Sequence, residues 1–259
     1  MKENKPQLWN EIWNAPSSIE EDIFNLTKAE NCIRWQRIEK IILREFESFN
    51  NLKVVEIGSG IGTYAALMAK REAEVTLFDY SENALKRARE FFKRIGLTAK
   101  FIKQDALSLS ADFLDQYDVS MSFGLAEHFR GTKRIKINKA HFDVLRKGGI
   151  AFISVPNKHN PPYRIFKFVA EHTGRWTVGE EYPYSRKELG NICGQIGITR
   201  YSFLGESLFA SFDFITRAPR AIIRKLFKLK SNVGISRKKE RGTFLDEYLS
   251  YALVVYGKK

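Results

Sequence analysis

The chain has 259 residues, of which 44% are hydrophobic and 28% charged, enough to bury the core of one large α/β domain or two small ones. It holds no run of 18 apolar residues, and its start, MKENKPQLWNEIWNAP, lacks the apolar stretch of a signal peptide, so we expect neither a membrane span nor secretion. Cys32 and Cys193 match no zinc spacing, which favours reduced, buried thiols, no metal site and a cytoplasmic protein.

The first 48 residues are rich in Trp and show amphipathic helical periodicity, which predicts an N-terminal helical cap over residues 1–48. Short apolar segments then alternate with helical segments. This alternation is typical of a parallel sheet with helices on both faces. The predicted strands are 52–58, 74–79, 99–103, 117–123 and 149–155, and the predicted helices are 62–71, 83–95 and 133–146.

After the fifth strand the pattern loosens. Residues 156–185 are rich in Pro, Gly and aromatic residues, which predicts a long lid loop with a short helix. A helix over 185–197, a sixth strand over 198–205 and a seventh within 247–259 complete the chain. We therefore predict an α/β fold in a single domain, with a Rossmann-like doubly wound sheet of seven strands, mostly parallel with the last antiparallel.

The segment VVEIGSGIGTYAALMA carries the strongest functional signal. Its strand ends in Gly58, Gly60 and Gly62, and a helix follows. Glycines let the backbone approach a ligand closely, and nucleotides bind where strand ends and helix N-termini meet. Asp79 ends the next strand, where an acid can bind ribose hydroxyls. A dinucleotide fingerprint needs Gly or Ala at its sixth position, but Thr63 stands there, so that alternative fails.

Five motifs in order resemble those of class I S-adenosylmethionine-dependent methyltransferases. They are VVEIGSGIG, LFDYSENAL, IKQDAL, EHF and VLRKGGIAFISVPN. Within that class the chain is most similar to small-molecule enzymes of the ubiquinone and menaquinone type. The resemblance implies a cofactor-binding core over residues 50–157, S-adenosylmethionine as the cofactor and S-adenosylhomocysteine as its product.

The resemblance assigns cofactor-binding residues to four of the strand ends. The loop after the first strand surrounds the methionine part of the cofactor, and the acid that ends the second strand binds the ribose. The acid after the third strand reads the adenine amino group, and the fourth strand ends under the cofactor. The residues are Glu56, Gly58, Ser59 and Gly60; Asp79 and Tyr80; Asp105 and Ala106; and Phe123 and Gly124.

His128, in GLAEHF after the fourth strand, is the candidate general base, because a neutral histidine has a pKa near the working pH. Glu127 beside it could orient the ring or serve as the base instead. The alternative is a structural histidine that caps a helix or loop. Methyl transfer otherwise needs alignment of the two reactants and exclusion of water.

The lid supplies candidate substrate contacts in Tyr163, Trp176, Tyr182 and Tyr184, although aromatic residues serve equally often as plain packing. The tetrad Asn160-Pro161-Pro162-Tyr163 resembles a motif of amino-group methyltransferases, but there it closes the fourth strand, whereas here it follows the fifth. We therefore expect Pro162 near a helix start and Tyr163 facing the pocket.

Residues 210–242 hold ten Lys+Arg against two acids and carry much of the net charge of +13. Their apolar residues recur at helical spacing, which predicts a basic amphipathic helix inserted between the sixth and seventh strands. Three interpretations stay open. The first is a helix packed on the core or a second subunit, the second is contact with an anionic membrane surface, and the third is nucleic-acid binding.

The leading functional hypothesis is a methyltransferase acting on a small-molecule acceptor, aromatic or lipophilic, in the cytoplasm or at the periphery of the membrane. The first alternative is an RNA or protein methyltransferase that uses the basic segment. The second is a non-catalytic binding protein on the same fold, against which the intact glycine loop argues. The motifs do not identify the acceptor, the methylated atom or the oligomeric state.

Overall fold

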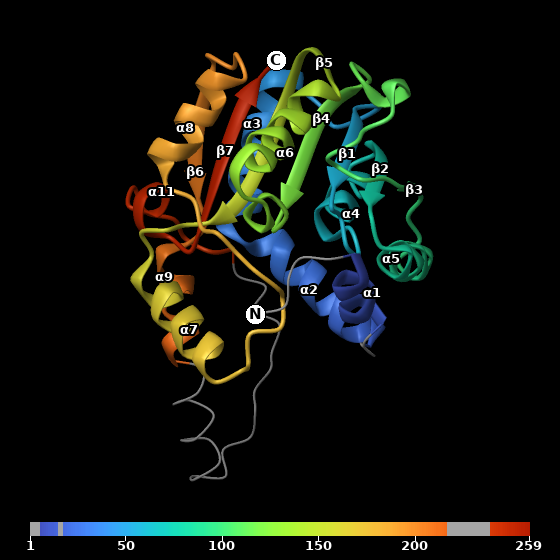
Figure 1. The fold of residues 1–259 in the computed structure, drawn as a ribbon. Coiled ribbons are helices and arrows are strands. Elements are labelled where there is room, and N and C mark those ends of the chain that lie inside the picture. Colours follow the sequence, from blue (N-terminus) through green and yellow to red (C-terminus); the bar gives the residue numbers. More distant parts are fainter. Residues whose placement is uncertain (1–5, 15–17, 217–238) are drawn as a thin grey trace.

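The computed structural model describes residues 6–14, 18–216 and 239–259. They contain one seven-stranded sheet of order β3-β2-β1-β4-β5-β7-β6 (Figure 1). This confirms the predicted fold class. The strands are β1 Lys53–Ile57, β2 Glu74–Asp79, β3 Lys100–Lys103, β4 Tyr117–Phe123, β5 Leu145–Pro156, β6 Tyr201–Gly205 and β7 Ala252–Lys258.

Strands β1 to β5 pair in parallel, whereas β7 runs antiparallel to both β5 and β6. The chain order reverses between β1 and β4, which are hydrogen-bonded neighbours at the centre of the sheet. Ligands of open α/β sheets bind at such a switch point, outside the carboxyl ends of the strands. The topology therefore brings the ends of β1, β2 and β4 together.

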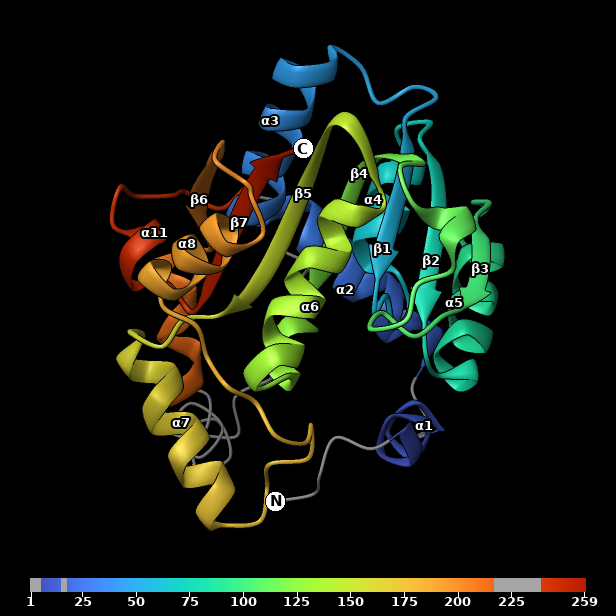
Figure 2. The same cartoon turned by 45° about the horizontal axis from the view of Figure 1, so that its top comes forward.

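Helices cover both faces of the sheet (Figures 1 and 2). One apolar core contains Trp35 and Ile38 of α3 together with Phe91 of α5, and the other contains Phe142 of α6 and Leu189 of α8. The helices of these layers, in chain order, are α2 Ile19–Asn31, α3 Ile33–Phe46, α4 Thr63–Ala69, α5 Glu82–Arg94, α6 Gly131–Asp143 and α8 Arg186–Gln195, with short 3₁₀ turns η1 Ala111–Phe113 and η2 Ala126–His128.

The lid segment contains α7, Pro161–His172, which is longer than the short helix expected there. The Asn160 side chain accepts a hydrogen bond from the Tyr163 backbone N–H at 2.8 Å, and the two prolines occupy the first helical positions, where no N–H is needed. The tetrad is thus a helix-capping element, which confirms the expectation for Pro162.

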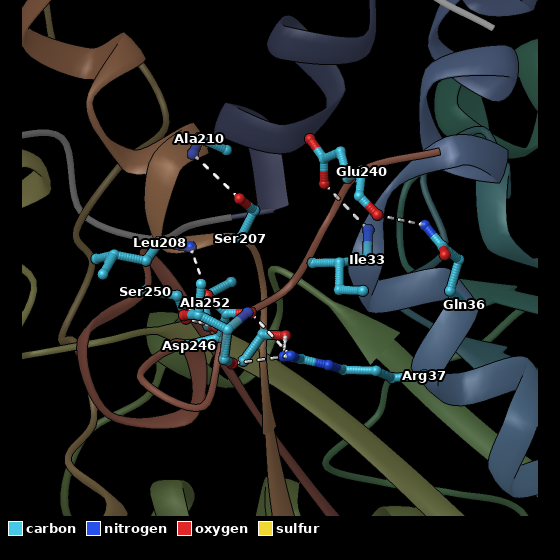
Figure 3. Close-up of polar contacts among 12 residues, drawn as sticks. Ile33, Gln36, Arg37, Ser207, Leu208, Ala210, Glu240, Asp246, Ser250 and Ala252 are labelled. Carbon is cyan, nitrogen blue, oxygen red and sulfur yellow. Dashed lines mark hydrogen bonds and ion pairs between the residues drawn. The ribbon is translucent and has the colours of Figure 1, made fainter. Parts of the chain in front are cut away.

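The seventh strand lies within the predicted range 247–259 but occupies only its second part. Residues Asp246–Leu249 form the short helix α11 instead. The Asp246 carboxylate accepts hydrogen bonds from the backbone N–H groups of Thr243 and Leu208, and it pairs with Arg37 of α3 at 2.8 Å (Figure 3). This buried carboxylate holds the turn and joins the β6–β7 connection to the helical layer.

Both cysteines are free thiols and buried, as predicted. The predicted basic helix lies mostly outside the described residues, since the structure describes only positions 210–216 and 239–242 of that segment. Its described start includes α9, Leu208–Ser211. Among the described residues no helix is both long and apolar enough to span a membrane.

Candidate functional site

A cavity of about 580 Å³ opens where β1, β2 and β4 end. All ten residues predicted to bind the cofactor line it, and so does His128. Their positions are separated by up to 68 residues in sequence, and the switch point of the sheet brings them together. The cavity volume lies within the range typical of small-molecule and cofactor sites.

The glycine loop between β1 and α4 is held by the carboxylate of Asp79. Its Oδ2 accepts a hydrogen bond from the Gly60 N–H at 2.8 Å, and its Oδ1 accepts one from Ser81 at 2.8 Å. Gly58 and Gly60 have φ of 64° and 54°, a region that other residues rarely adopt. A Cβ atom at Gly58 would lie 2.7 Å from Leu125, so the cavity floor needs glycine there.

Glu56, in β1, is buried beneath this loop. Its Oε2 accepts a hydrogen bond from the Ala65 backbone N–H at 2.7 Å. Burial raises the pKa of the Glu56 carboxyl to about 8, and the negative charge of Asp79 adds to the effect. Burial also raises the pKa of Asp79. Two buried acids that resist ionisation would be stabilised as carboxylates by a cationic ligand group.

Asp105 lies after β3, at another side of the cavity from Glu56. Its Oδ1 accepts a hydrogen bond from the Leu107 backbone N–H at 2.8 Å, which shapes the turn that follows the strand. The neighbouring Gln104 donates its backbone N–H to the Asp79 carbonyl at 3.0 Å. The β2 and β3 ends therefore form one continuous wall with acidic groups on it.

Arg34 and Tyr64 also line the cavity, and the motifs did not reveal them. The Arg34 Nε donates to the Tyr64 hydroxyl at 2.8 Å, and its Nη1 donates to Ser154 Oγ at 2.9 Å. The ring of Tyr64 stacks on Phe123 with 3.7 Å between centroids. These contacts link α3, α4, β4 and β5, which lie far apart in sequence.

Helix α1, Pro6–Asn14, covers the glycine loop with two tryptophans. The ring of Trp13 lies so close to Gly60 that a Cβ atom there would be 2.6 Å from it. Trp9 meets His128 edge to face at 4.7 Å, and the Asn10 side chain accepts a hydrogen bond from Ser81 at 2.7 Å. The N-terminal segment thus forms part of the cavity wall, next to α5 (Figure 2).

The imidazole ring of His128 makes two backbone contacts. Nδ1 lies 2.9 Å from the carbonyl oxygen of Glu180, and the backbone of Gly124 also hydrogen-bonds the ring. Burial lowers the pKa of His128 below its ordinary value despite these two contacts. The ring therefore ties the end of β4 to the loop before Glu181, and these contacts favour a positioning role.

Glu127, beside His128, is 2% exposed, and its Oε2 has no hydrogen-bond partner within the part of the chain described. Together with His128 and Glu181 it forms a group whose donor atoms lie within 4.8 Å of one another, and such a set could hold a metal ion. Burial raises the pKa of the carboxyls of Glu127 and Glu181. For Glu127, the negative charge of Glu181 raises the pKa further. Both carboxyls are therefore harder to ionise than exposed ones.

The four lid aromatics do not line this cavity. Tyr184 is fully buried, with its hydroxyl bonded to Asn138 and to the Ala126 carbonyl at 3.1 Å each. Tyr163 is also buried and donates its hydroxyl to Glu181 at 2.8 Å. Trp176 and Tyr182 contact their own loop and basic side chains rather than the cavity. The structure places Tyr163 and Tyr184 in the packed interior, so the expectation that Tyr163 faces the pocket is wrong.

We predict that Glu56→Gln makes the protein more stable than the native chain as the pH rises. The buried acid keeps its proton up to about pH 8, whereas in the unfolded chain it loses it near its ordinary value of 4.5. The native chain therefore loses stability between these pH values, by at most about 1.4 kcal/mol per pH unit from this group, and the amide variant does not. Urea unfolding at pH 5.5, 7 and 8.5 measures the difference.

The exposed Glu74→Gln, at the start of β2, is the matched control for that measurement. Its stability should follow that of the native chain at all three pH values. Parallel curves for Glu56→Gln and the native chain would contradict the assignment of a proton to Glu56.

We predict that the imidazole of His128 stays neutral down to a pH below its ordinary pKa of 6.5, because burial disfavours the charged ring. Nitrogen-15 NMR of the histidine side chains measures this, with His128→Gln identifying the signal. A ring that titrates at or above pH 6.5 would contradict the buried, doubly anchored arrangement.

The comparisons with known proteins agree with this geometry. The family model described as "Methyltransferase domain" matches residues 54–149. A ubiquinone biosynthesis O-methyltransferase of Rickettsia felis is 24% identical over 163 residues, which cover 63% of this chain and 65% of that protein. The protein of the same name from Roseobacter denitrificans is 29% identical over 156 residues, covering 59% and 62%. The matched region thus spans slightly less than two thirds of these relatives.

Solved structures share the fold at low identity. Magnesium protoporphyrin IX methyltransferase from Synechocystis, with bound S-adenosylhomocysteine, gives a TM-score of 0.59 at 13% identity and covers 98% of this chain and 94% of its own. An N-methyltransferase of Haemonchus contortus, solved with phosphomonomethylethanolamine and S-adenosylhomocysteine, gives 0.57 at 17% identity, covering 87% and 52%. The family model thus identifies a methyltransferase domain over residues 54–149, and the ordered motifs and the strand order agree with that match.

Proposed function

We propose that this chain transfers a methyl group from S-adenosylmethionine to a small-molecule acceptor. The observation that carries the proposal is the cavity in which the glycine loop, Asp79 and Asp105 meet at the switch point of the sheet. The residues fit the cofactor, because the buried acids suit its cationic groups and the glycines leave room for a close approach.

In this proposal Glu56 and the loop at Gly58 and Gly60 hold the methionine part of the cofactor, Asp79 the ribose and Asp105 the adenine. When bound, the cofactor supplies an electrophilic methyl carbon, to which the acceptor's lone pair bonds while the carbon–sulfur bond breaks and its electron pair passes to sulfur. The protein's own task is to align the acceptor and exclude water. Trp9 and Trp13 serve the second task, since they cover the cavity.

We predict that Asp79→Asn weakens S-adenosylhomocysteine binding by about 10- to 100-fold, because a hydrogen bond to a charged acceptor contributes about 1.5–3 kcal/mol. Asparagine keeps one acceptor oxygen for the loop N–H groups but lacks the charge. A titration that follows the fluorescence of Trp9 and Trp13 measures the affinity.

The control for that titration is Asp112→Asn, an exposed acid outside the cavity, which should bind like the native chain. Unchanged affinity in Asp79→Asn would show that this acid does not contact the ribose.

We further infer that the enzyme contacts an anionic membrane surface near its lid. Helices α7 and α9 expose apolar side chains, with Phe168 60% and Phe209 65% exposed. Phe166 of α7 packs on Phe214, three residues after the end of α9, at 5.3 Å between ring centroids, so α7 lies beside the segment that contains α9 (Figure 1). The adjoining sequence 210–242 carries ten Lys+Arg, and apolar residues next to basic ones are typical of membrane-surface contact.

We predict that the protein floats with vesicles of phosphatidylcholine and phosphatidylglycerol but not with pure phosphatidylcholine. The double substitution Phe168→Ser and Phe209→Ser should reduce the floating fraction, because it removes exposed apolar area. Leu114→Ser, an exposed apolar residue after η1, serves as the control. Protein that stays at the bottom of the gradient with anionic vesicles would refute membrane contact.

A further inference from the structure

A second cavity, of about 340 Å³, adjoins the first. Arg34, Thr63 and Tyr64 line both, so the two cavities adjoin at these three residues. The second cavity lies between α2, the start of α3, α9 and the residues that precede β7. It is therefore placed over the β5–β7–β6 side of the sheet, next to the site proposed for the cofactor.

Three carboxylates line this second cavity, from Glu206, Asp213 and Glu240, against the two cations Lys28 and Arg34. The guanidinium of Arg34 is already engaged by the Tyr64 and Ser154 hydroxyls, and its Nη2 lies 3.7 Å from Glu206. Among the described residues of the lining, carboxylates therefore outnumber cations by one, and Arg34 is already paired.

Glu240 forms part of the cavity wall and is held in place by α3. Its Oε2 accepts a hydrogen bond from the Ile33 N–H at 3.0 Å, and its backbone carbonyl accepts one from the Gln36 side chain at 3.2 Å (Figure 3). These two contacts hold the Glu240 carboxylate in place, and its remaining oxygen lone pairs can accept further hydrogen bonds.

Aromatic rings complete the lining. Phe214 and Tyr251 lie 4.7 Å apart between centroids, and Tyr64 lies on the side shared with the first cavity. Burial raises the pKa of the Tyr251 hydroxyl, followed by the charges of Glu181, Glu127 and Glu206. The positive charge of Arg34 acts in the opposite direction, so three carboxylates and one cation act on Tyr251.

We propose that the second cavity binds the methyl acceptor, and that this acceptor is a small amine that enters as an ammonium ion. The inference rests on the proposed methyltransferase function and names its substrate class. Carboxylates and the faces of aromatic rings both attract an ammonium group, most strongly where water is excluded. The same lining repels a carboxylate, and it offers a neutral alcohol hydrogen bonds but no attraction between opposite charges.

The amine must lose one proton before its nitrogen can act as a nucleophile. Glu206 lines the cavity 3.7 Å from Arg34, one of the residues that border both cavities, and we assign it as the acceptor of that proton. The lone pair left on nitrogen then forms the new bond to the methyl carbon. This assignment makes Glu206 both a binding group and the base.

The test uses matched amines, alcohols and carboxylates on butyl, phenylethyl and imidazolylethyl frames. Calorimetry measures their binding to the full chain in the presence of S-adenosylhomocysteine. On at least one frame the amine should bind at least tenfold more tightly than its alcohol and carboxylate. The inference fails if no amine binds, or if the alcohol or carboxylate of each frame binds as tightly as the amine.

Glu206→Gln and Phe214→Ala should each weaken binding of the preferred amine about tenfold while leaving S-adenosylhomocysteine binding unchanged, and Asp112→Asn should change neither. Amine binding that survives Glu206→Gln would overturn the assignment of that carboxylate. If S-adenosylhomocysteine itself does not bind the native chain, the proposed function fails; if it binds but the amines do not, only this inference fails.

Discussion

The site depends on one constraint, the burial of carboxylates at the carboxyl edge of the sheet. Asp79 orders the glycine loop through the Gly60 N–H, and Glu56 fixes the start of α4 through the Ala65 N–H. Burial raises the pKa of both acids, and a cationic ligand group would stabilise their charged forms. The structural role of these acids and their proposed binding role therefore use the same atoms.

Two groups of side chains enclose the cavity at this edge of the sheet. The tryptophans of α1 close the side above the glycine loop, and the layer of Arg34, Tyr64 and Phe123 closes the side toward β5 and β7. Arg34 and Tyr64 lie where the two cavities adjoin, and the linings of these cavities differ. Such an arrangement suits a transfer reaction, in which donor and acceptor occupy separate sites that meet at one point.

The seven strands, the antiparallel direction of the last one and the ten proposed cofactor contacts could be predicted from the sequence, because their signals are local. A strand that ends in Gly58 or Asp79 shows its role within a few residues. Arg34 could not be found in this way, since its partners Tyr64 and Ser154 lie 30 and 120 residues away. Aromatic residues are equally common in pockets and in cores, so the sequence could not show that Tyr163 and Tyr184 belong to the core, where both are buried. The helical turn at Asp246 depends on Arg37 and Leu208, again distant in sequence.

The most direct test of the central claim is calorimetry of the native chain with S-adenosylhomocysteine at pH 7, in two buffers of different ionisation enthalpy. The account predicts saturable binding to one site per chain, with protons released, because the ammonium group of the ligand stabilises the charged form of Glu56. The absence of binding heat at high ligand concentration would contradict the assignment of the cavity. Binding without proton release would contradict the role given to Glu56.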